Sequence, residues 1–229
     1  MDSKQTIGSA HAFGDLPVLG EDPDRTYRLG IMGGTFDPIH NGHLVTAEQS
    51  RTELGLDLVV FMPAGSPAYK QDRRVSSAED RYAMTLLATA DNPSFRASRY
   101  EIEREGVTYT VDTLSGLREL YPDNVELYFI TGADAIIDIV KWRNADRIAE
   151  LATMVGATRP GYDLDVATDA IAESGIDFDV IYLEVPALAI SSSYLRGRAA
   201  AGQSLRYLTP DHVVDYISGH GLYEPEGEA

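Results

Sequence analysis

The sequence predicts an α/β fold in which helices cover both faces of an open, parallel β-sheet. Three observations lead to this prediction. Short apolar segments alternate with helix-like segments along most of the chain, which is typical of strand–helix–strand units. The first apolar segment, residues 27–32, runs directly into two glycines and then a helix start. With 229 residues, 44% of them hydrophobic, the chain is long enough to build one sizeable core.

The first half of the chain follows this alternation. Residues 27–32 are expected to form a buried strand, and the next helix opens at Asn41 or Asp37 and stops at Gly55. The elements expected after it are a compact apolar strand over 58–63, a polar loop over 65–74 with cations at Lys70, Arg73 and Arg74, a helix behind the capping box Ser76–Glu79, and a strand over 95–98 that extends toward Ile102.

The second half repeats the pattern. A helix is expected over 111–120, a central strand over 125–130, and further strands over 152–157 and 180–185. About six strands with helices between them predict a Rossmann-like open parallel sheet, followed by a small C-terminal helical subdomain. Such sheets bind ligands at the carboxyl ends of their strands. The segments after the first, second and central strands are therefore expected to share one pocket.

The domain organisation expected from composition is simple. Residues 1–25 are rich in Gly, Pro and acidic residues and have no apolar core typical of a secretory signal, so they are interpreted as a flexible extension. Residues 26–224 would form a single domain, with its helical part at about 190–224, and 225–229 a tail. No apolar run approaches the roughly 18 residues that a membrane span needs. With no cysteine in the chain, disulfides and thiol catalysis are excluded and a cytoplasmic location is expected.

The net charge limits the possible partners. A formal charge of −17 argues against a general nucleic-acid binder, because such proteins neutralise phosphates with basic surfaces. An acidic protein that binds an anion must gather its few cations locally, so the positions of Lys and Arg carry information.

The segment Gly33–His43, with the sequence Gly-Gly-Thr-Phe-Asp-Pro-Ile-His-Asn-Gly-His, indicates a phosphate site. Glycines let backbone N–H groups approach a ligand closely, and the following helix directs its positive N-terminal end at the same place. His40 and His43 lie three residues apart, so both imidazoles project near that end. The spacing matches neither the G-x-G-x-x-G nor the G-x-x-x-x-G-K-[ST] phosphate motif.

A second phosphate motif lies at Ile190–Arg196, with the sequence Ile-Ser-Ser-Ser-Tyr-Leu-Arg. Serines at a helix start cap its N–H groups or donate to a bound phosphate, and Arg196, about one turn later, can reach the same anion.

Together these segments resemble the signatures of the HxGH nucleotidyltransferase superfamily, in which the first motif binds and activates ATP and the second reads Ile-Ser-Ser-Thr-x-x-Arg. Ser193 replaces the threonine and keeps its hydroxyl. The middle of the chain is similar to bacterial nicotinate-nucleotide (NaMN) adenylyltransferases, and the resemblance runs from about Tyr27 to Tyr223. The segments that carry it are Arg104–Leu114, Gly132–Asp134, Trp142 and Arg159–Tyr162.

The resemblance implies an enzyme that joins nicotinate mononucleotide and ATP, with Mg²⁺ accompanying the ATP and no dedicated metal site on the protein. It leaves a homo-oligomer possible and implies neither a nucleic-acid nor a membrane partner. The residues implied fall into three groups: His40, His43, Lys70 and Arg196 as catalytic; Gly33, Gly34, Thr35, Phe36, Gly132, Ser191, Ser192 and Ser193, with His40, His43 and Arg196, for ATP; and Thr110, Asp134, Trp142, Arg143 and Arg159 for the mononucleotide.

Chemistry supports two of these assignments independently. Trp142 lies in the polar segment Lys141–Asn144, and an indole face stacks well on an electron-poor pyridinium. A nicotinate carboxylate needs N–H donors or a cation, which Arg143 could supply. Two positions depart from the family pattern: Tyr69 stands where relatives commonly have histidine, and Arg143 where many have an aromatic residue.

Other functions remain open at this stage. The nearest is an adenylyltransferase that prefers the amide mononucleotide. Cytidylyltransferases and pantetheine-phosphate adenylyltransferases are disfavoured by the segments at 104–114 and 132–142. A non-catalytic nucleotide sensor would keep only ATP binding. A metal hydrolase built on His40, His43 and Asp37 would lack further histidines, because His11, His212 and His220 lie in terminal segments.

Overall fold

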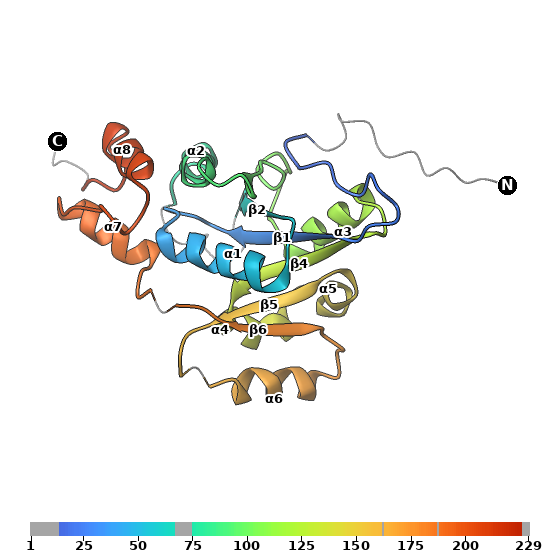
Figure 1. The fold of residues 1–229 in the computed structure, drawn as a ribbon. Helices are drawn as coiled ribbons and strands as arrows, with labels where there is room; N and C mark the ends of the chain where they lie inside the picture. Colours follow the sequence, from blue (N-terminus) through green and yellow to red (C-terminus); the bar gives the residue numbers. More distant parts are fainter. Residues whose placement is uncertain (1–13, 67–74, 162, 187, 226–229) are drawn as a thin grey trace.

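The protein is described by a computed structural model that covers residues 14–66, 75–161, 163–186 and 188–225. A six-stranded, fully parallel sheet forms its centre, in the order β3-β2-β1-β4-β5-β6 (Figure 1). The strands are β1 (Tyr27–Gly34), β2 (Leu58–Pro63), β3 (Phe95–Ala97), β4 (Val125–Gly132), β5 (Thr153–Thr158) and β6 (Val180–Glu184). The prediction of an open parallel α/β sheet is confirmed.

Helices pack on both faces of the sheet (Figure 1). One face carries α3 (Thr110–Leu120), α4 (Ala133–Ile137), the short 3₁₀ helix η2 (Ile139–Lys141), α5 (Ala145–Leu151) and α6 (Asp165–Ser174). The other carries α1 (Asn41–Leu54), α2 (Ala78–Thr89), α7 (Ser192–Ala200) and α8 (Asp211–Gly219).

Alternation along each strand divides the core into two hydrophobic clusters. In β2, Val60 and Met62 face the α3–α6 layer, whereas Val59 and Phe61 face the α1, α2, α7 and α8 layer. Successive side chains of a strand point to opposite faces, and a strand covered on both sides is apolar at every position. This explains why the strands were recognisable as continuous apolar runs.

The helix that follows the signature begins at Asn41, one of the two predicted starts, and not at Asp37. His40 is the N-cap of α1, and its backbone N–H donates to the Nδ1 atom of His43 over 3.2 Å. The helix ends at Gly55 in the left-handed conformation, as predicted. In the Ser76–Glu79 segment it is Ser77 that caps α2, by accepting from the backbone N–H of Asp80.

The second half of the predicted N-terminal extension is part of the folded domain. Leu16 and Leu19 are buried in the core. Asp15 accepts hydrogen bonds from the Ser98 hydroxyl and the Arg99 backbone, and the Tyr121 hydroxyl donates to the carbonyl of Pro17. The prediction of a flexible segment over 1–25 is therefore wrong for residues 14–25, because two leucines among polar residues suffice to anchor the chain. Residues 1–13 lie outside the described residues, as does all of the predicted tail 225–229 except residue 225.

The C-terminal helical part shares the main core. Leu195 of α7 and Val213 and Ile217 of α8 are buried in the same cluster as α1 and α2. Their apolar faces thus extend one layer of the domain. Within the described part of the chain, no helix is long and apolar enough to cross a membrane.

Candidate active site

Two cavities lie side by side at the carboxyl ends of the central strands. The sheet order changes direction between β1 and β4, and the chain leaves these neighbouring strands on opposite faces of the sheet. Such a switch point is the usual ligand site of an open α/β sheet. Gly33 of β1 and Thr131 of β4 line both cavities, so the two spaces share a wall.

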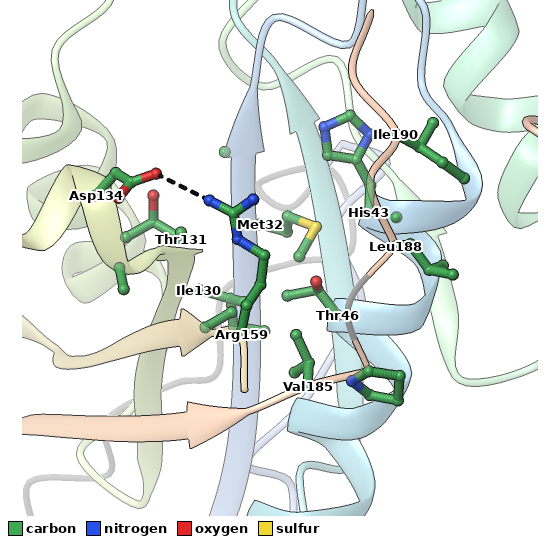
Figure 2. A pocket seen from close by; sticks show the side chains of 16 residues that line it. Met32, His43, Thr46, Ile130, Thr131, Asp134, Arg159, Val185, Leu188 and Ile190 are labelled. Carbon is green, nitrogen blue, oxygen red and sulfur yellow. Dashed lines mark ion pairs between the residues drawn. The ribbon is translucent and has the colours of Figure 1, made fainter. Parts of the chain in front are cut away.

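The larger cavity has a volume of about 420 Å³. Figure 2 shows side chains around it from three parts of the chain: His43 and Thr46 from α1, Asp134 and Arg159 after β4 and β5, and Leu188 and Ile190 ahead of α7. The last two give it an apolar flank, and Arg159 forms a 3.7 Å ion pair with Asp134 at the rim. This combination of an apolar flank, glycine backbone and a helix N-terminus suits a nucleoside with attached phosphates.

The two histidines of the signature are stacked at the start of α1. Their ring centroids lie 3.7 Å apart at an interplanar angle of 23°, and the Phe36 ring meets His43 edge-on. Phe36 itself is buried in the core and lines neither cavity. Gly42 allows this arrangement, because a Cβ atom there would come within 3.0 Å of the His40 ring.

His40 is neutral in the absence of ligand. Burial lowers its pKa from 6.5 to about 4. Its Nδ1 atom is buried without a hydrogen-bond partner among the described residues. A buried imidazole with an unused nitrogen, next to a helix N-terminus, can take up a proton when an anion arrives.

The second motif docks onto the first. The Ser192 hydroxyl donates to the carbonyl of Pro38 over 2.9 Å, and Arg196 donates to the carbonyl of Asp37 over 2.7 Å. Ser191 caps α7, and a second nitrogen of Arg196 donates to the Ser193 hydroxyl. Although Pro38 and Ser192 are 154 positions apart in the sequence, the fold thus brings the two motifs into direct contact.

Asp37 joins the signature segment to two distant parts of the chain. Its carboxylate is 3% exposed, accepts from the Tyr223 hydroxyl over 2.6 Å and lies 3.4 Å from the Ser76 backbone N–H. Burial, together with the Asp37 carboxylate, raises the pKa of Tyr223, so the phenol stays protonated and donates. Because these groups already occupy the carboxylate, the geometry does not favour a metal hydrolase built on Asp37.

The smaller cavity, of about 190 Å³, has an aromatic wall. Trp142 lines it, half-buried and edge-on to Phe129 at a centroid distance of 6.1 Å. The Arg143 guanidinium lies 4.7 Å from the centre of the Tyr109 ring, and Thr110 begins α3 at the same cavity. Glu101 is the buried acid of this space; its carboxylate accepts from the Thr113 hydroxyl over 2.7 Å.

Ten predicted site residues line these two spaces, whereas Phe36, His40, Ser191, Ser192, Ser193 and Arg196 line neither of them. Gly132, Asp134, Arg159 and His43 line the larger cavity, and Gly34, Thr35, Thr110, Trp142 and Arg143 the smaller. Asp134 and Arg159, expected for the mononucleotide, line the larger cavity with His43 and Gly132, whereas Gly34 and Thr35, expected for ATP, line the smaller one. Lys70 lies outside the described residues.

Several residues at or behind the site were not foreseen, and three of them are informative. Glu101 and Thr131 line the cavities, and the buried Arg81 contacts the loops behind them. Thr131 directly follows a predicted strand, and residues at that position commonly bind ligands in a parallel sheet, so it could have been predicted. A single acid or arginine inside an amphipathic or loop segment gives no such signal, because most charged residues are solvated.

Comparisons with known proteins show the family to which this chain belongs. Residues 31–198 match the cytidylyltransferase-like family. The chain is 53% identical to a probable nicotinate-nucleotide adenylyltransferase of Corynebacterium glutamicum, over 89% of this chain and 91% of that protein. A protein of the same name from Mycolicibacterium vanbaalenii is 51% identical, over 89% and 95% of the two chains.

A solved structure shows the same fold at low identity. It is the Plasmodium falciparum nicotinic acid mononucleotide adenylyltransferase complexed with NaAD, with a TM-score of 0.69 and 20% identity over 86% of this chain and 97% of that one. Sequence identities above 50% over 89% of this chain establish the relationship, and the chain belongs to the nicotinate-nucleotide adenylyltransferase family.

Proposed function

We propose that this protein joins nicotinate mononucleotide to the adenylyl group of ATP, giving nicotinate adenine dinucleotide and pyrophosphate in NAD biosynthesis. The observation that carries the proposal is the pair of cavities that share Gly33 and Thr131 as a common wall. One has a phosphate-binding helix start and the other a flat aromatic wall. A dinucleotide-forming enzyme needs two such neighbouring spaces whose occupants meet at their phosphates.

The reaction is an in-line attack by the 5′-phosphate of the mononucleotide on the α-phosphorus of ATP. A new P–O–P bond forms as the bond between the α- and β-phosphates breaks, and pyrophosphate leaves. A phosphate dianion is already nucleophilic, so no general base is required. The protein has to align the two phosphates and neutralise the charge that develops on the leaving group.

The two signature motifs supply this neutralisation in the proposal. His43 faces the larger cavity from the first turn of α1, and His40 stacks on it. Arg196, Ser191, Ser192 and Ser193 belong to the start of α7, which docks on the signature loop. We place Lys70 with them on the resemblance alone. Asp134 and Arg159 fit the ATP side, because both line the larger cavity.

The mononucleotide would occupy the smaller cavity. Its pyridinium ring can stack on Trp142, and Thr110 at the start of α3 offers backbone N–H and hydroxyl donors. Arg143 is held over the Tyr109 ring at this cavity, where a cation favours a carboxylate over a carboxamide. Glutamine at position 143 should therefore reduce the preference for the acid substrate. An unchanged ratio of acid to amide activity would remove this role.

Mg²⁺ fits the proposal as a partner of the phosphates. In the described ranges of the chain, no group of three or more His, Asp or Glu side chains could hold a metal ion. The ion would thus be bound mainly by phosphate oxygens and water, and it would neutralise charge on the triphosphate. The net charge of −17 further leads us to propose that the enzyme has no nucleic-acid partners, and a chain without cysteine fits action in the cytoplasm.

The first experiment is pyrophosphate release with Mg-ATP and either nicotinate mononucleotide or its amide, with the dinucleotide product confirmed by mass. Strong preference for the acid is expected. Comparable or greater turnover of the amide would favour an amide or dual-specificity enzyme. Tight ATP binding without turnover would favour a nucleotide sensor and overturn the proposal.

A further inference from the structure

Arg81 is the largest side chain in the fully buried part of the core, yet it belongs to neither signature. It lies in the first turns of α2 and is 2% exposed. All three guanidinium nitrogens donate to backbone carbonyls: Nε to Ser76 over 3.1 Å, Nη1 to Thr35 over 3.0 Å and Nη2 to Gly65 over 3.1 Å. A buried charge needs such donor–acceptor contacts on every side.

The three carbonyls belong to three different segments of the site. Thr35 lies in the signature loop after β1, Gly65 follows β2, and Ser76 precedes α2. The first two segments are also joined by a hydrogen bond of 2.8 Å from the Ala64 backbone N–H to the Gly34 carbonyl. Gly34, Thr35 and Ala64 all line the smaller cavity, so Arg81 stands directly behind the wall that they form.

This wall has little freedom to rearrange. A Cβ atom on Gly65 would approach the Glu101 carbonyl to 2.3 Å, so the backbone of Gly65 is pressed against the segment that carries Glu101. Burial lowers the pKa of Arg81, and the negative charges of Asp37 and Glu101 act in the opposite direction. Both acids are themselves buried. A planar guanidinium can satisfy three acceptors in fixed directions, which an ammonium cannot do with the same geometry.

We infer that Arg81 is a positioning residue for the mononucleotide: through the carbonyls of Thr35, Gly65 and Ser76 it fixes the wall of the smaller cavity. The inference rests on the proposed function for the identity of the ligand. Arg81 lines neither cavity, so it acts through the wall alone. Gly34, Thr35 and Ala64, which form this wall, do not line the larger cavity. ATP binding there should therefore depend less on the wall than mononucleotide binding does.

Arg81→Lys tests the inference, with Arg118→Lys as a matched control. Arg118, a partly buried residue of α3, likewise donates to backbone carbonyls, those of Val125 over 2.6 Å and Pro122 over 3.4 Å, but these lie at and just before the amino end of β4, away from both cavities. Trp142 is the sole tryptophan and lines the smaller cavity, so quenching of its fluorescence reports mononucleotide binding without turnover. Pyrophosphate release by the wild-type protein tests the proposed function separately.

In Arg81→Lys, the Kd and KM for nicotinate mononucleotide should rise about tenfold or more, since misplacement of a site by about 1 Å can cost a factor of about a hundred. The KM for ATP should change less than about threefold. Arg118→Lys should lower the melting temperature and leave both KM values unchanged. Equal changes in both KM values, or normal mononucleotide binding by a destabilised Arg81→Lys, would overturn the inference.

A measurement on the wild-type protein covers the case in which Arg81→Lys does not fold. The side-chain Nε–H resonances of Arg81 and Arg118 can be assigned in ¹⁵N-labelled protein. Added mononucleotide should shift the Arg81 resonance and leave that of Arg118 in place. An Arg81 resonance that does not move at saturating mononucleotide would contradict the inference.

Discussion

Substitution of Glu101 by glutamine should stabilise the protein, and the gain should grow as the pH rises. Glu101 is 5% exposed, and burial raises the pKa of its carboxyl from 4.5 to about 7, although the hydrogen bond from Thr113 partly offsets this effect. Between these two values the folded state holds a proton that the unfolded state has released. At low pH the carboxyl is neutral, so its burial carries no cost of desolvating a charge. The protein loses stability as the pH rises from 4.5 toward 7.

The size of the effect follows from the two pKa values. Their difference corresponds to about 3 kcal/mol of destabilisation once both states are ionised, near pH 8, and to only about 1 kcal/mol at pH 5. Glutamine is neutral at every pH and keeps an oxygen that can accept from Thr113. Any fixed cost of placing its NH₂ group in the core is the same at both pH values. The change in the mutational effect between pH 5 and pH 8, about 2 kcal/mol, is thus the quantity to test.

Urea unfolding followed by circular dichroism at pH 5, 6, 7 and 8 gives this quantity directly. Glu105→Gln is the control, because Glu105 is an exposed acid four residues away. Its substitution should shift stability by less than about 0.5 kcal/mol at each pH. If Glu101→Gln changed stability equally at pH 5 and pH 8, the argument from burial would be refuted.

Three further predictions concern the signature loop. His43→Ala should lower kcat about a hundredfold or more, as for other lost transition-state donors, and a near-normal kcat would exclude that role. Tyr223→Phe removes the donor to buried Asp37 and should cost about 1–3 kcal/mol in urea unfolding; an unchanged midpoint would show the contact to be unimportant. His40 should titrate near pH 4 in the free protein, so stability should fall as the pH drops from 6.5 through 4. A non-hydrolysable ATP analogue should raise this pKa in NMR titrations, and an unmoved titration curve would argue against phosphate contact.

Much of the fold could be predicted because strand and helix signals in this chain are local. Apolar runs such as 58–63 form strands that are covered on both faces of the sheet. Gly55 ends α1 because glycine readily adopts the left-handed conformation of a helix C-cap. The N-terminal segment was misjudged because Leu16 and Leu19 are the only buried hydrophobic residues in 14–25, and a pair of apolar residues has no periodicity. Long-range pairing gives no local signal at all.

The candidate site was predictable where chemistry is concentrated in a short motif. His40, His43 and Arg196 came from two such motifs, whose mutual contact through Asp37 and Pro38 only the fold reveals. Asp134 and Arg159 could not be assigned to a side of the site from sequence, because the strand order decides which loops face which cavity. Arg81 was missed because its function depends on three carbonyls that are distant in sequence.

The hydrogen bond from Tyr223 to Asp37 spans 186 residues and ties the last part of the chain to the first motif. During synthesis on the ribosome, the phosphate-binding loop therefore emerges long before the residue that completes its support. A nascent chain released before residue 223 would carry both histidines and both motifs but would leave a buried carboxylate without its donor. The support of the first motif is thus completed only after nearly the whole chain has been made, and chains that end before Tyr223 should be less stable by at least about 1–3 kcal/mol, the cost of a buried acceptor left without this donor.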